Sequence, residues 1–308
     1  MLEHRRINLA LLLIIITLFL LFFIGGPSYY SPIESKLFWN NGHIIFYCMT
    51  SFMIMKYLLK RSYSLFSVII LTLLYTLILG VLVEVVQSNL NREMDYADLY
   101  RNFLGSLLGI LCYQVFSRQK NKITMTVLAF ITVLIVIEQF ALFSVLSLKY
   151  QQYKKLPILA DFSLKGEVMF WSEGELMTNE SENHRQSLKF TLATGEKYSG
   201  FTFNEVYQDW RNYRFIEFHL RSESQKAEKL CIKITDLSHD EGSHEYSDRF
   251  NYCSTLAYGK NVIEIPLDKI RNAPKTRTLN LAEISRIGFF MIDLTEEKTL
   301  YIDKITLK

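Results

Sequence analysis

Charge is scarce in the first half of this sequence. Residues 1–150 contain 12 Lys/Arg and 7 Asp/Glu, whereas residues 151–308 contain the other 22 basic and 24 acidic residues. So few charges, placed between long apolar runs, are typical of a membrane domain rather than of a soluble one. The second half has an ordinary soluble composition. The slightly basic pI of about 8.5 comes from loops beside the apolar runs, so we expect no nucleic-acid partner.

Enzyme motifs are also absent from the second half. It has no G-x-S-x-G nucleophile elbow, no Walker phosphate loop, no H-E-x-x-H zinc motif and no close Cys/His cluster. His239 and His244 share a polar loop with Asp236, Asp240 and Glu241; a solvated loop is the more common outcome of such a composition, and a metal site is the alternative. We therefore expect no cofactor and no bound metal.

Five apolar runs come near the ~20 residues that are needed to cross ~30 Å of hydrocarbon. They are Ile7–Ile24, Leu37–Leu59, Leu65–Val86, Leu99–Phe116 and Ile123–Leu148. The first run could instead belong to a secretory signal peptide, but it is long for one and no small-x-small cleavage site follows it. We therefore predict an α-helical transmembrane bundle of five spans over residues 1–148.

Basic residues predict the orientation of these spans, because Lys and Arg concentrate in short cytoplasmic loops. The basic clusters at alternate ends of the spans are Arg5/Arg6, Lys56/Lys60/Arg61 and Arg118/Lys120/Lys122. They predict a multi-pass protein of the bacterial cytoplasmic membrane, with a cytoplasmic N-terminus and an extracytoplasmic C-terminal half. Lys149, Lys154 and Lys155 favour the opposite orientation, but they precede a large folded domain, where charge has less influence.

Polar residues inside the spans converge at one depth, near the outer surface. The predicted polar pocket contains His43, Tyr47, Glu84, Gln87, Arg92, Asp95, Asp98 and Asn102. On one helix these polar positions continue into Gly105 and Gly109, which let another backbone approach closely, so this face meets protein rather than lipid. The charges could simply pair to fix helix packing, or they could form a functional pocket. Glu138, in the fifth span, has no partner that the sequence can name.

These polar residues form one long run, Glu84-x2-Gln87-x4-Arg92-x2-Asp95-x2-Asp98-x3-Asn102-x2-Gly105-x3-Gly109, preceded by His43-x3-Tyr47. The run resembles the VanZ-like family of small bacterial membrane proteins, named after a glycopeptide-antibiotic (teicoplanin) resistance factor, over residues 7–117. Trp39 and Asn40 stand where the family often has an Asp-Lys pair. The resemblance implies an envelope-associated protein but no known reaction.

Short alternating runs begin at about residue 160 and predict strands. The candidate strands are 187–193, 213–220, 229–236, 248–255, 261–266, 284–292 and 299–307. Strands at this spacing favour an all-β sandwich over residues 160–308, after a linker at 149–159.

Two of these strands predict their own register. If 229–236 and 248–255 pair as a hairpin, Ile232 lies opposite Tyr252 and Ile234 opposite Phe250, which gives one apolar and one polar face. The same register places Lys233 beside Asn251.

The four cysteines fall into two groups. Cys48 and Cys112 lie in apolar spans and are expected to be small packing residues. The hairpin register sets Cys231 opposite Cys253, at a Cα separation of ~4.5 or ~5.5 Å. A disulfide tolerates about 4.4–6.8 Å, so this geometry permits a disulfide. Two reduced thiols side by side are the alternative.

A second resemblance covers residues 160–308. It is carried by Tyr198-x-Gly200, Asp209-Trp210, Asp248-Arg249-Phe250, Gly259-x-Asn261, Ile265-Pro266-Leu267 and Tyr301-Ile302-Asp303. These features are similar to the carbohydrate-binding, galactose-binding-like jelly rolls and to the complex-I intermediate-associated type, and this resemblance implies glycan binding. The glycan-binding candidates are Phe215, Glu217, His219, Lys233, Arg249 and Asn251. The alternative is that Trp171, Trp210 and the tyrosines fill the sandwich core.

The leading hypothesis is a non-catalytic cell-envelope membrane protein. Its external jelly roll would hold a cell-surface glycan or lipid-linked ligand near an outward-facing polar pocket, with a role in glycan handling or teicoplanin resistance. The alternative is a membrane enzyme acting on such a glycan with His43 and Glu84 as catalytic acid and base, which requires the two side chains to be within reach of each other or of one water. A purely structural or assembly protein is the third hypothesis.

Overall fold

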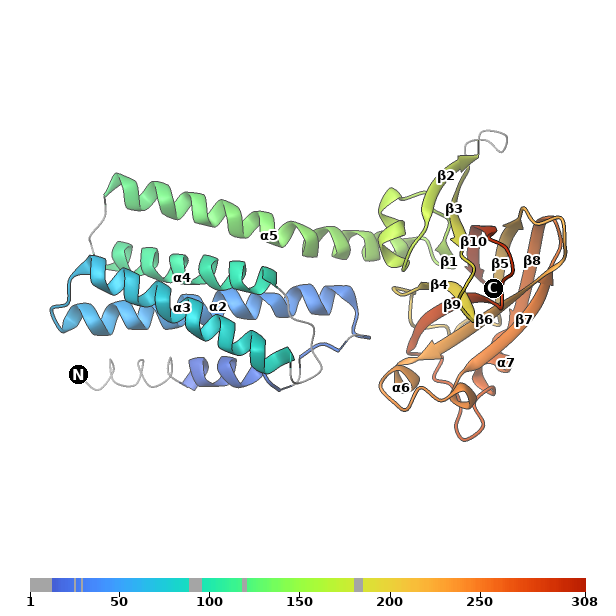
Figure 1. Cartoon of the computed structure of the whole chain (residues 1–308), viewed down its shortest axis with the longest axis horizontal. Helices are drawn as coiled ribbons and strands as arrows, with labels where there is room; N and C mark the ends of the chain where they lie inside the picture. Colours follow the sequence, from blue (N-terminus) through green and yellow to red (C-terminus); the bar gives the residue numbers. More distant parts are fainter. Residues whose placement is uncertain (1–12, 25, 29, 89–95, 118–120, 180–184) are drawn as a thin grey trace. The chain divides into compact units, whose positions relative to one another are not determined.

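Two compact units make up the chain, Met1–Val145 and Leu146–Lys308. The computed structural model describes residues 13–24, 26–28, 30–88, 96–117, 121–179 and 185–308. The first unit is helical and the second is mainly β (Figure 1). The division between them falls inside helix α5.

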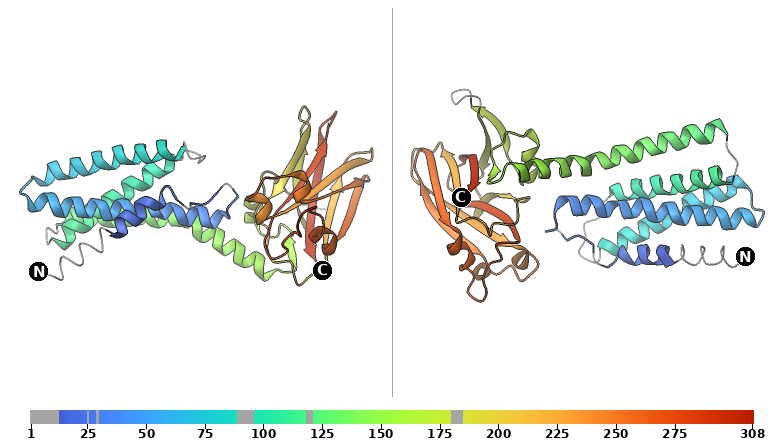
Figure 2. Two further views of the ribbon diagram at one scale, coloured as in Figure 1. Left: turned by 90° about the horizontal axis from the view of Figure 1, so that it is seen from below. Right: turned by 180° about the vertical axis from the view of Figure 1, so that it is seen from behind.

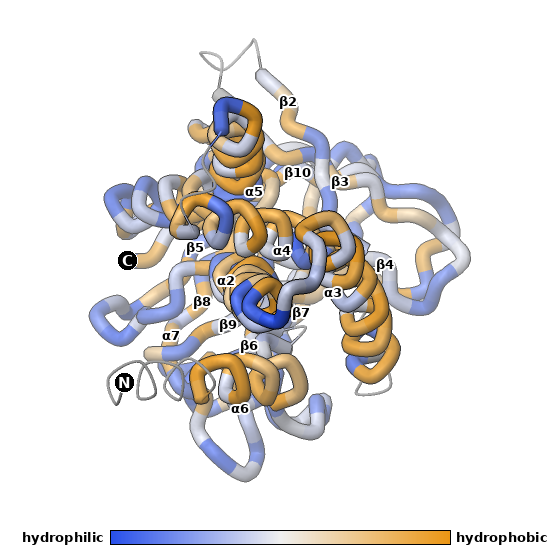
Figure 3. Tube along the Cα trace, turned by 90° about the vertical axis from the view of Figure 1, so that its left-hand side faces the viewer, coloured by the Kyte–Doolittle hydropathy of each residue, from blue (hydrophilic) through white to orange (hydrophobic). Residues whose placement is uncertain are grey.

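Four long helices are described: α2 (Ile33–Lys60), α3 (Leu65–Ser88), α4 (Tyr96–Phe116) and α5 (Lys122–Lys154). Among the described residues, three segments are long and apolar enough to cross a membrane: Ile33–Leu59, Leu65–Gln87 and Lys122–Lys154. Helix α3 is apolar along most of its length (Figure 3), and α5 is apolar enough to span a membrane. The two helices leave large side chains such as Ile78 and Val136 exposed. Such apolar surface suits lipid, which is as apolar as these side chains.

Three of the five predicted spans are long and apolar enough to cross a membrane within the described residues; the other two stay predictions. Helix α4 forms where a span was predicted, but it contains Asp98 and Arg101 and is not among the three. In the predicted first span, residues 13–21 are helical, while its beginning lies outside the described residues.

Helices α2 and α4 touch through their backbones. A Cβ added to Gly105 would lie 2.3 Å from the carbonyl oxygen of Ile44, and one added to Gly109 would lie 2.2 Å from that of Cys48. Only glycine allows this approach, and the predicted close contact along this face of α4 is confirmed.

Hydroxyl groups extend this contact to α3. The Ser106 hydroxyl of α4 lies 2.8 Å from that of Ser51 on α2, and Thr76 of α3 donates to Ser106 at 2.9 Å. Buried hydrogen bonds between hydroxyl groups therefore join α2, α3 and α4 beside the two glycines.

The second unit is a sandwich of two antiparallel sheets (Figures 1 and 2). Sheet A has the order β2-β3-β10-β5-β8, with β1 paired to β10, and sheet B has the order β4-β9-β6-β7. The strands are β1 (Ile158–Ala160), β2 (Glu175–Asn179), β3 (Arg185–Leu192), β4 (Tyr198–Phe203), β5 (Phe215–Ser222), β6 (Glu228–Asp236), β7 (Phe250–Leu256), β8 (Gly259–Pro266), β9 (Ile284–Ile292) and β10 (Lys298–Leu307). Short helices α6 (Leu237–Asp240) and α7 (Leu267–Arg271) follow β6 and β8.

Alternation along the strands builds the core between the sheets. Ile216, Phe218 and Leu220 of β5 are buried, while the residues between them are half-buried on the outer face. Trp171 stacks on Phe203 with ring centroids 4.5 Å apart, and both aromatic rings belong to the core. The core interpretation of Trp171 is therefore confirmed, and Trp210 is also fully buried.

The hairpin of β6 and β7 has the predicted register, with Cys231 opposite Cys253, Ile232 opposite Tyr252 and Lys233 opposite Asn251. All seven predicted strands form, with ends shifted by at most two residues. Strands β1, β2 and β4 were not predicted, because each is short or interrupted by glycine or polar residues.

The segment 149–159, expected as a linker, is ordered structure: α5 continues to Lys154, and β1 begins at Ile158. Gln152 donates to the carbonyl oxygen of Leu159 at 3.2 Å, and Leu148 packs against the sandwich core. These contacts keep the polar end of α5 helical.

We predict that Gly109→Ala destabilises the helical unit, because its Cβ would push the backbones of α2 and α4 apart. We expect a loss of about 1–3 kcal/mol in the free energy of unfolding, the usual cost of overpacking. The measurement is denaturant unfolding of the full chain in detergent. Gly42→Ala on α2 is the control, because its Cβ meets nothing within 4 Å; equal stability of both variants would contradict the prediction.

Candidate functional site

A buried polar cluster joins α2, α3 and α4. It contains His43, Glu84 and Asp98, whose ligand-type atoms all lie within 4.8 Å of one another. The His43 Nε2 atom is 3.4 Å from Asp98 Oδ2, and His43 Nδ1 is 2.9 Å from Asn102 Oδ1. Four of the predicted pocket residues therefore meet in one place.

Arg101 completes this cluster and was not predicted. Its guanidinium donates to Asp98 at 2.6 Å and to Glu138 of α5 at 2.6 Å. This pairing supplies the partner of Glu138 that the sequence could not name. The i, i+3 spacing of Asp98 and Arg101 on one helix is the sequence signal that could have predicted their contact.

The other predicted pocket residues divide into two groups. Tyr47 is fully buried, and Gln87 donates to the carbonyl oxygen of Phe22 at 2.9 Å. Arg92 and Asp95 lie outside the described residues. Their expected coupling to Glu84 and Asp98 therefore remains a prediction.

The enzyme hypothesis required His43 and Glu84 to be within reach of one water. A separation of at most 4.8 Å satisfies this distance, because one water can bridge two groups that are each about 2.8 Å away from it.

A second site lies on the outer face of sheet B. It is a cavity of about 570 Å³ lined by Tyr198, Gly200, Phe201, Thr202, Cys231, Lys233, Tyr246, Arg249, Asn251, Cys253, Phe289, Phe290 and Ile292. The strand registers align these residues in two rows, Thr202-Gly288-Lys233-Asn251 and Gly200-Phe290-Cys231-Cys253. We call this cavity the sheet B pocket.

Two glycines in these rows, Gly200 and Gly288, allow close contacts at the sheet B pocket. A Cβ on Gly288 would lie 2.3 Å from Cε of Lys233, and one on Gly200 would lie 2.2 Å from the carbonyl oxygen of Phe289. The stem of Lys233 therefore lies across β9 in the space that another residue would fill. Glycine in the middle of a strand often marks such an approach and was the available sequence signal.

Two cations face this pocket. Arg249 donates to Asn251 Oδ1 at 3.1 Å, and its guanidinium carbon lies 5.3 Å from the centre of the Tyr246 ring. Burial lowers the pKa of Lys233, and the charges of Arg249 and Arg286 lower it further. Burial also lowers the pKa of Arg249. Within the described part of the chain, no carboxylate forms an ion pair with Lys233 or Arg249.

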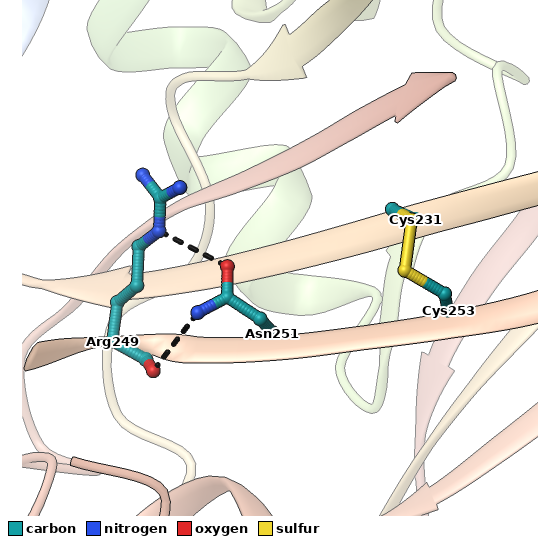
Figure 4. The surroundings of a disulfide bond; sticks show 4 residues. All are labelled: Cys231, Arg249, Asn251 and Cys253. Atoms are coloured by element: carbon teal, nitrogen blue, oxygen red, sulfur yellow. Dashed lines mark hydrogen bonds between the residues drawn. A yellow bond between two sulfur atoms is a disulfide. The ribbon is translucent and has the colours of Figure 1, made fainter. Parts of the chain in front are cut away.

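The floor of the pocket contains a disulfide between Cys231 and Cys253, which joins β6 to β7 next to Asn251 (Figure 4). Cys48 and Cys112 are free and half-buried in the helical unit.

The loop between β6 and β7 is held by Arg277. Its guanidinium donates to Asp236 at 2.6 and 2.7 Å and to Asp248 at 2.6 Å. Asp248 directly precedes Arg249, so this clamp positions one of the pocket cations. His239 is buried and lies 3.3 Å from Asp248, and Asp236 and Asp240 are buried as well. Glu241 and His244 are exposed, so the predicted polar loop is packed at its start and solvated beyond it.

The remaining glycan-binding candidates lie on the other sheet. Phe215, Glu217 and His219 belong to β5 of sheet A. Glu217 is 2.7 Å from His219 and also pairs with Lys308, and the bond from Lys308 is the main cause that lowers its pKa. The six candidates are thus divided between two faces, and only Lys233, Arg249 and Asn251 share a pocket. Sequence reasoning missed the aromatic wall of Tyr198, Tyr246 and Phe290.

Comparisons with known proteins complete this description. No family model matches the sequence, and no curated protein matches it, so neither comparison supports the VanZ-like resemblance. Among solved structures, the family 11 carbohydrate-binding module from Clostridium thermocellum, in complex with a β-1,3-1,4-mixed-linked tetrasaccharide, is 21% identical with a TM-score of 0.37, and the match covers 49% of this chain and 93% of that one.

Two further structures are similar over the same share of the chain. An exo-β-agarase is 16% identical with a TM-score of 0.40, covering 49% of this chain and 24% of that one. A non-crystalline-cellulose-specific module, CBM28, is 11% identical with a TM-score of 0.34, covering 50% and 93%.

We predict that the Arg277 clamp makes the sandwich sensitive to acid. Burial alone would raise the pKa of Asp236, but the bonds from Arg277, Asn280 and His239 outweigh burial and lower it. The bond from Arg277 also lowers the pKa of Asp248. A lowered folded-state pKa gives stability that is fully present above the unfolded value of ~3.9 and is lost as the pH falls through the folded value.

Arg277→Gln should therefore reduce the free energy of unfolding by about 3 kcal/mol at pH 7 and flatten its decline as the pH falls below about 4. The measurement is tryptophan fluorescence during denaturant unfolding at each pH. Arg211→Gln is the control, because its pair with Asp209 is exposed and worth at most ~1 kcal/mol. The same loss in both variants would rule out a special role for the clamp.

Proposed function

We propose that this protein is a membrane-anchored glycan receptor whose sheet B pocket binds a negatively charged glycan outside the cytoplasmic membrane. The observation that carries the proposal is the pairing of two cations, Lys233 and Arg249, with aromatic rings in one open cavity. Aromatic faces stack on the apolar faces of sugar rings, and amide and hydroxyl groups such as those of Asn251 and Thr202 bond to sugar hydroxyls.

Charge favours an acidic ligand over a neutral one. Burial lowers the pKa of both Lys233 and Arg249, and the charge of Arg249 lowers that of Lys233 further. An anion bound between them would favour the protonated form of each. A carboxylate or phosphate accepts charge-assisted bonds from the Arg249 fork and from the Lys233 ammonium.

Two features support an extracytoplasmic position of the sandwich. A disulfide persists in an oxidising compartment and is rare in the cytosol. Two of the basic residues that favoured the opposite orientation are also neutralised within the second unit, since Lys149 pairs with Glu205 and Lys155 with Asp161 and Glu167.

A role in glycopeptide (teicoplanin) resistance is supported only by the VanZ-like run of residues 84–109. A change in teicoplanin susceptibility on deletion of the gene is the test of that part.

We predict that an acidic glycan binds the full chain and that Lys233→Gln and Arg249→Gln each weaken binding by about 10- to 100-fold, because a charge-assisted bond contributes ~1.5–3 kcal/mol. The measurement is calorimetry on the detergent-solubilised protein after a screen of uronic-acid and phosphate-bearing glycans. The mixed-linked tetrasaccharide serves as a neutral ligand and should not bind.

Lys229→Gln is the matched control, because it removes the same charge from an exposed position of β6 outside the pocket. Binding of the neutral tetrasaccharide alone, or equal affinity of the three variants for the acidic glycan, would contradict the proposal.

We also predict the orientation. In a background without Cys48 and Cys112, an impermeant maleimide added to intact cells should label Lys275→Cys and should not label Lys122→Cys. Both positions are exposed, so accessibility to the reagent depends on the compartment. Labelling of both after the membrane is opened is the control; labelling of Lys122→Cys alone in intact cells would reverse the topology.

A further inference from the structure

We propose that His43, Glu84 and Asp98 bind one divalent transition-metal cation inside the helical unit. The three side chains come from α2, α3 and α4, and all three are buried. The site is separate from the sheet B pocket and does not depend on glycan binding.

Distances within the cluster suit a metal ion. Ligand atoms at ~2.0–2.1 Å from a tetrahedral ion lie about 3.4 Å from each other. His43 Nε2 and Asp98 Oδ2 are 3.4 Å apart. Glu84 offers an oxygen within 4.8 Å of both, so a movement of that oxygen on the order of 1 Å separates it from the ~3.4 Å spacing of tetrahedral ligands.

The outer contacts orient each ligand toward the centre. The amide oxygen of Asn102 can only accept, so His43 Nδ1 carries the proton of the 2.9 Å bond. In the neutral imidazole, the form that binds metals, the lone pair of Nε2 then faces Asp98. Asp98 uses Oδ1 for Arg101 and turns Oδ2 to His43. A histidine whose second nitrogen is bonded to an oxygen acceptor is the usual arrangement around metal ligands.

Two buried polar atoms beside the cluster point to a further ligand. Within the described residues, the Tyr47 hydroxyl and the Asn102 amide nitrogen have no hydrogen-bond partner, although both side chains are at most 1% exposed. Both atoms border Gly80, whose added Cβ would lie 2.9 Å from the Asn102 nitrogen and 3.7 Å from the Tyr47 oxygen. A buried donor without a partner costs about 1–3 kcal/mol, and a water or hydroxide on the metal would accept from them.

Charge also favours a cation. Arg101 is shared between Asp98 and Glu138, so one positive charge serves two carboxylates in a low-dielectric region. A divalent ion on Asp98 and Glu84 would offset the remaining negative charge.

The ligand set selects the class of ion. One imidazole with two carboxylates suits Zn²⁺, Mn²⁺ or Fe²⁺, whereas Mg²⁺ and Ca²⁺ prefer oxygen ligands alone. Three protein ligands leave one coordination position for a water, next to Tyr47 and Asn102.

The test uses the full chain in detergent, purified without a histidine tag, stripped with a chelator and titrated with Zn²⁺. We expect one tightly bound Zn²⁺ per chain, not displaced by excess Mg²⁺, and a rise in melting temperature on addition of Zn²⁺. His43→Gln and Glu84→Gln should weaken Zn²⁺ binding by at least 100-fold. Asn102→Ala, which removes only the outer contact, should weaken it by about 10- to 100-fold.

Two controls separate this site from other acidic or histidine groups. Glu173→Gln removes an exposed carboxylate of the second unit, and His244→Gln removes an exposed histidine; both should bind Zn²⁺ as the wild type does. Where a ligand variant fails to fold, the wild-type titration still decides. No tightly bound Zn²⁺ in the wild type, displacement by Mg²⁺, or unchanged affinity in Asn102→Ala and His43→Gln would each overturn the proposal.

Discussion

The backbone contact between α2 and α4 is the constraint on which the helical unit depends. Helix axes usually lie 8–10 Å apart because side chains separate them, and Gly105 and Gly109 remove that separation. Ile44, which touches Gly105, follows His43 directly, and Asn102 precedes Gly105 by one turn. The absence of two side chains therefore brings a histidine and an amide into hydrogen-bond contact. A wider helix pair would leave both polar groups buried and unpaired.

The sandwich also depends on glycine for close contacts. A Cβ on Gly200 would meet the backbone of Phe289, and the space beside Gly288 is filled by a side chain from β6. The methylene stem of Lys233 occupies part of that space and brings its charge over the sheet. Arg249 reaches the same cavity because the Arg277 clamp holds the residue before it. The two charges in the pocket thus come from different segments, Lys233 from β6 and Arg249 from the position just before β7. The position of Arg249 depends on the Arg277 clamp.

Local sequence patterns predicted the features that depend on residues close together in the chain. The alternation in β6 and β7 was sufficient for the hairpin register, and the helical spacing of Asp98, Asn102 and Gly105 was sufficient for the buried face of α4. Contacts between distant segments were not predictable in the same way: the pairing of Arg101 with Glu138 depends on how α4 and α5 pack, and the Arg277 clamp joins positions 41 residues apart. Strand β4 was missed because Gly200 interrupts its apolar alternation, although this glycine shapes the pocket. Apolar length alone does not establish α4 as a span, because it contains Asp98 and Arg101.

The disulfide has a consequence for the integrity of the chain. Its two cysteines are 22 residues apart, and between them lie α6 and the whole loop that carries Tyr246. Closing a loop of this size stabilises a fold by about 3 kcal/mol in the chain-entropy view. A protease that cut the exposed residues 241–246 would therefore release no fragment, and the nicked protein would remain one covalent molecule until the bridge was reduced.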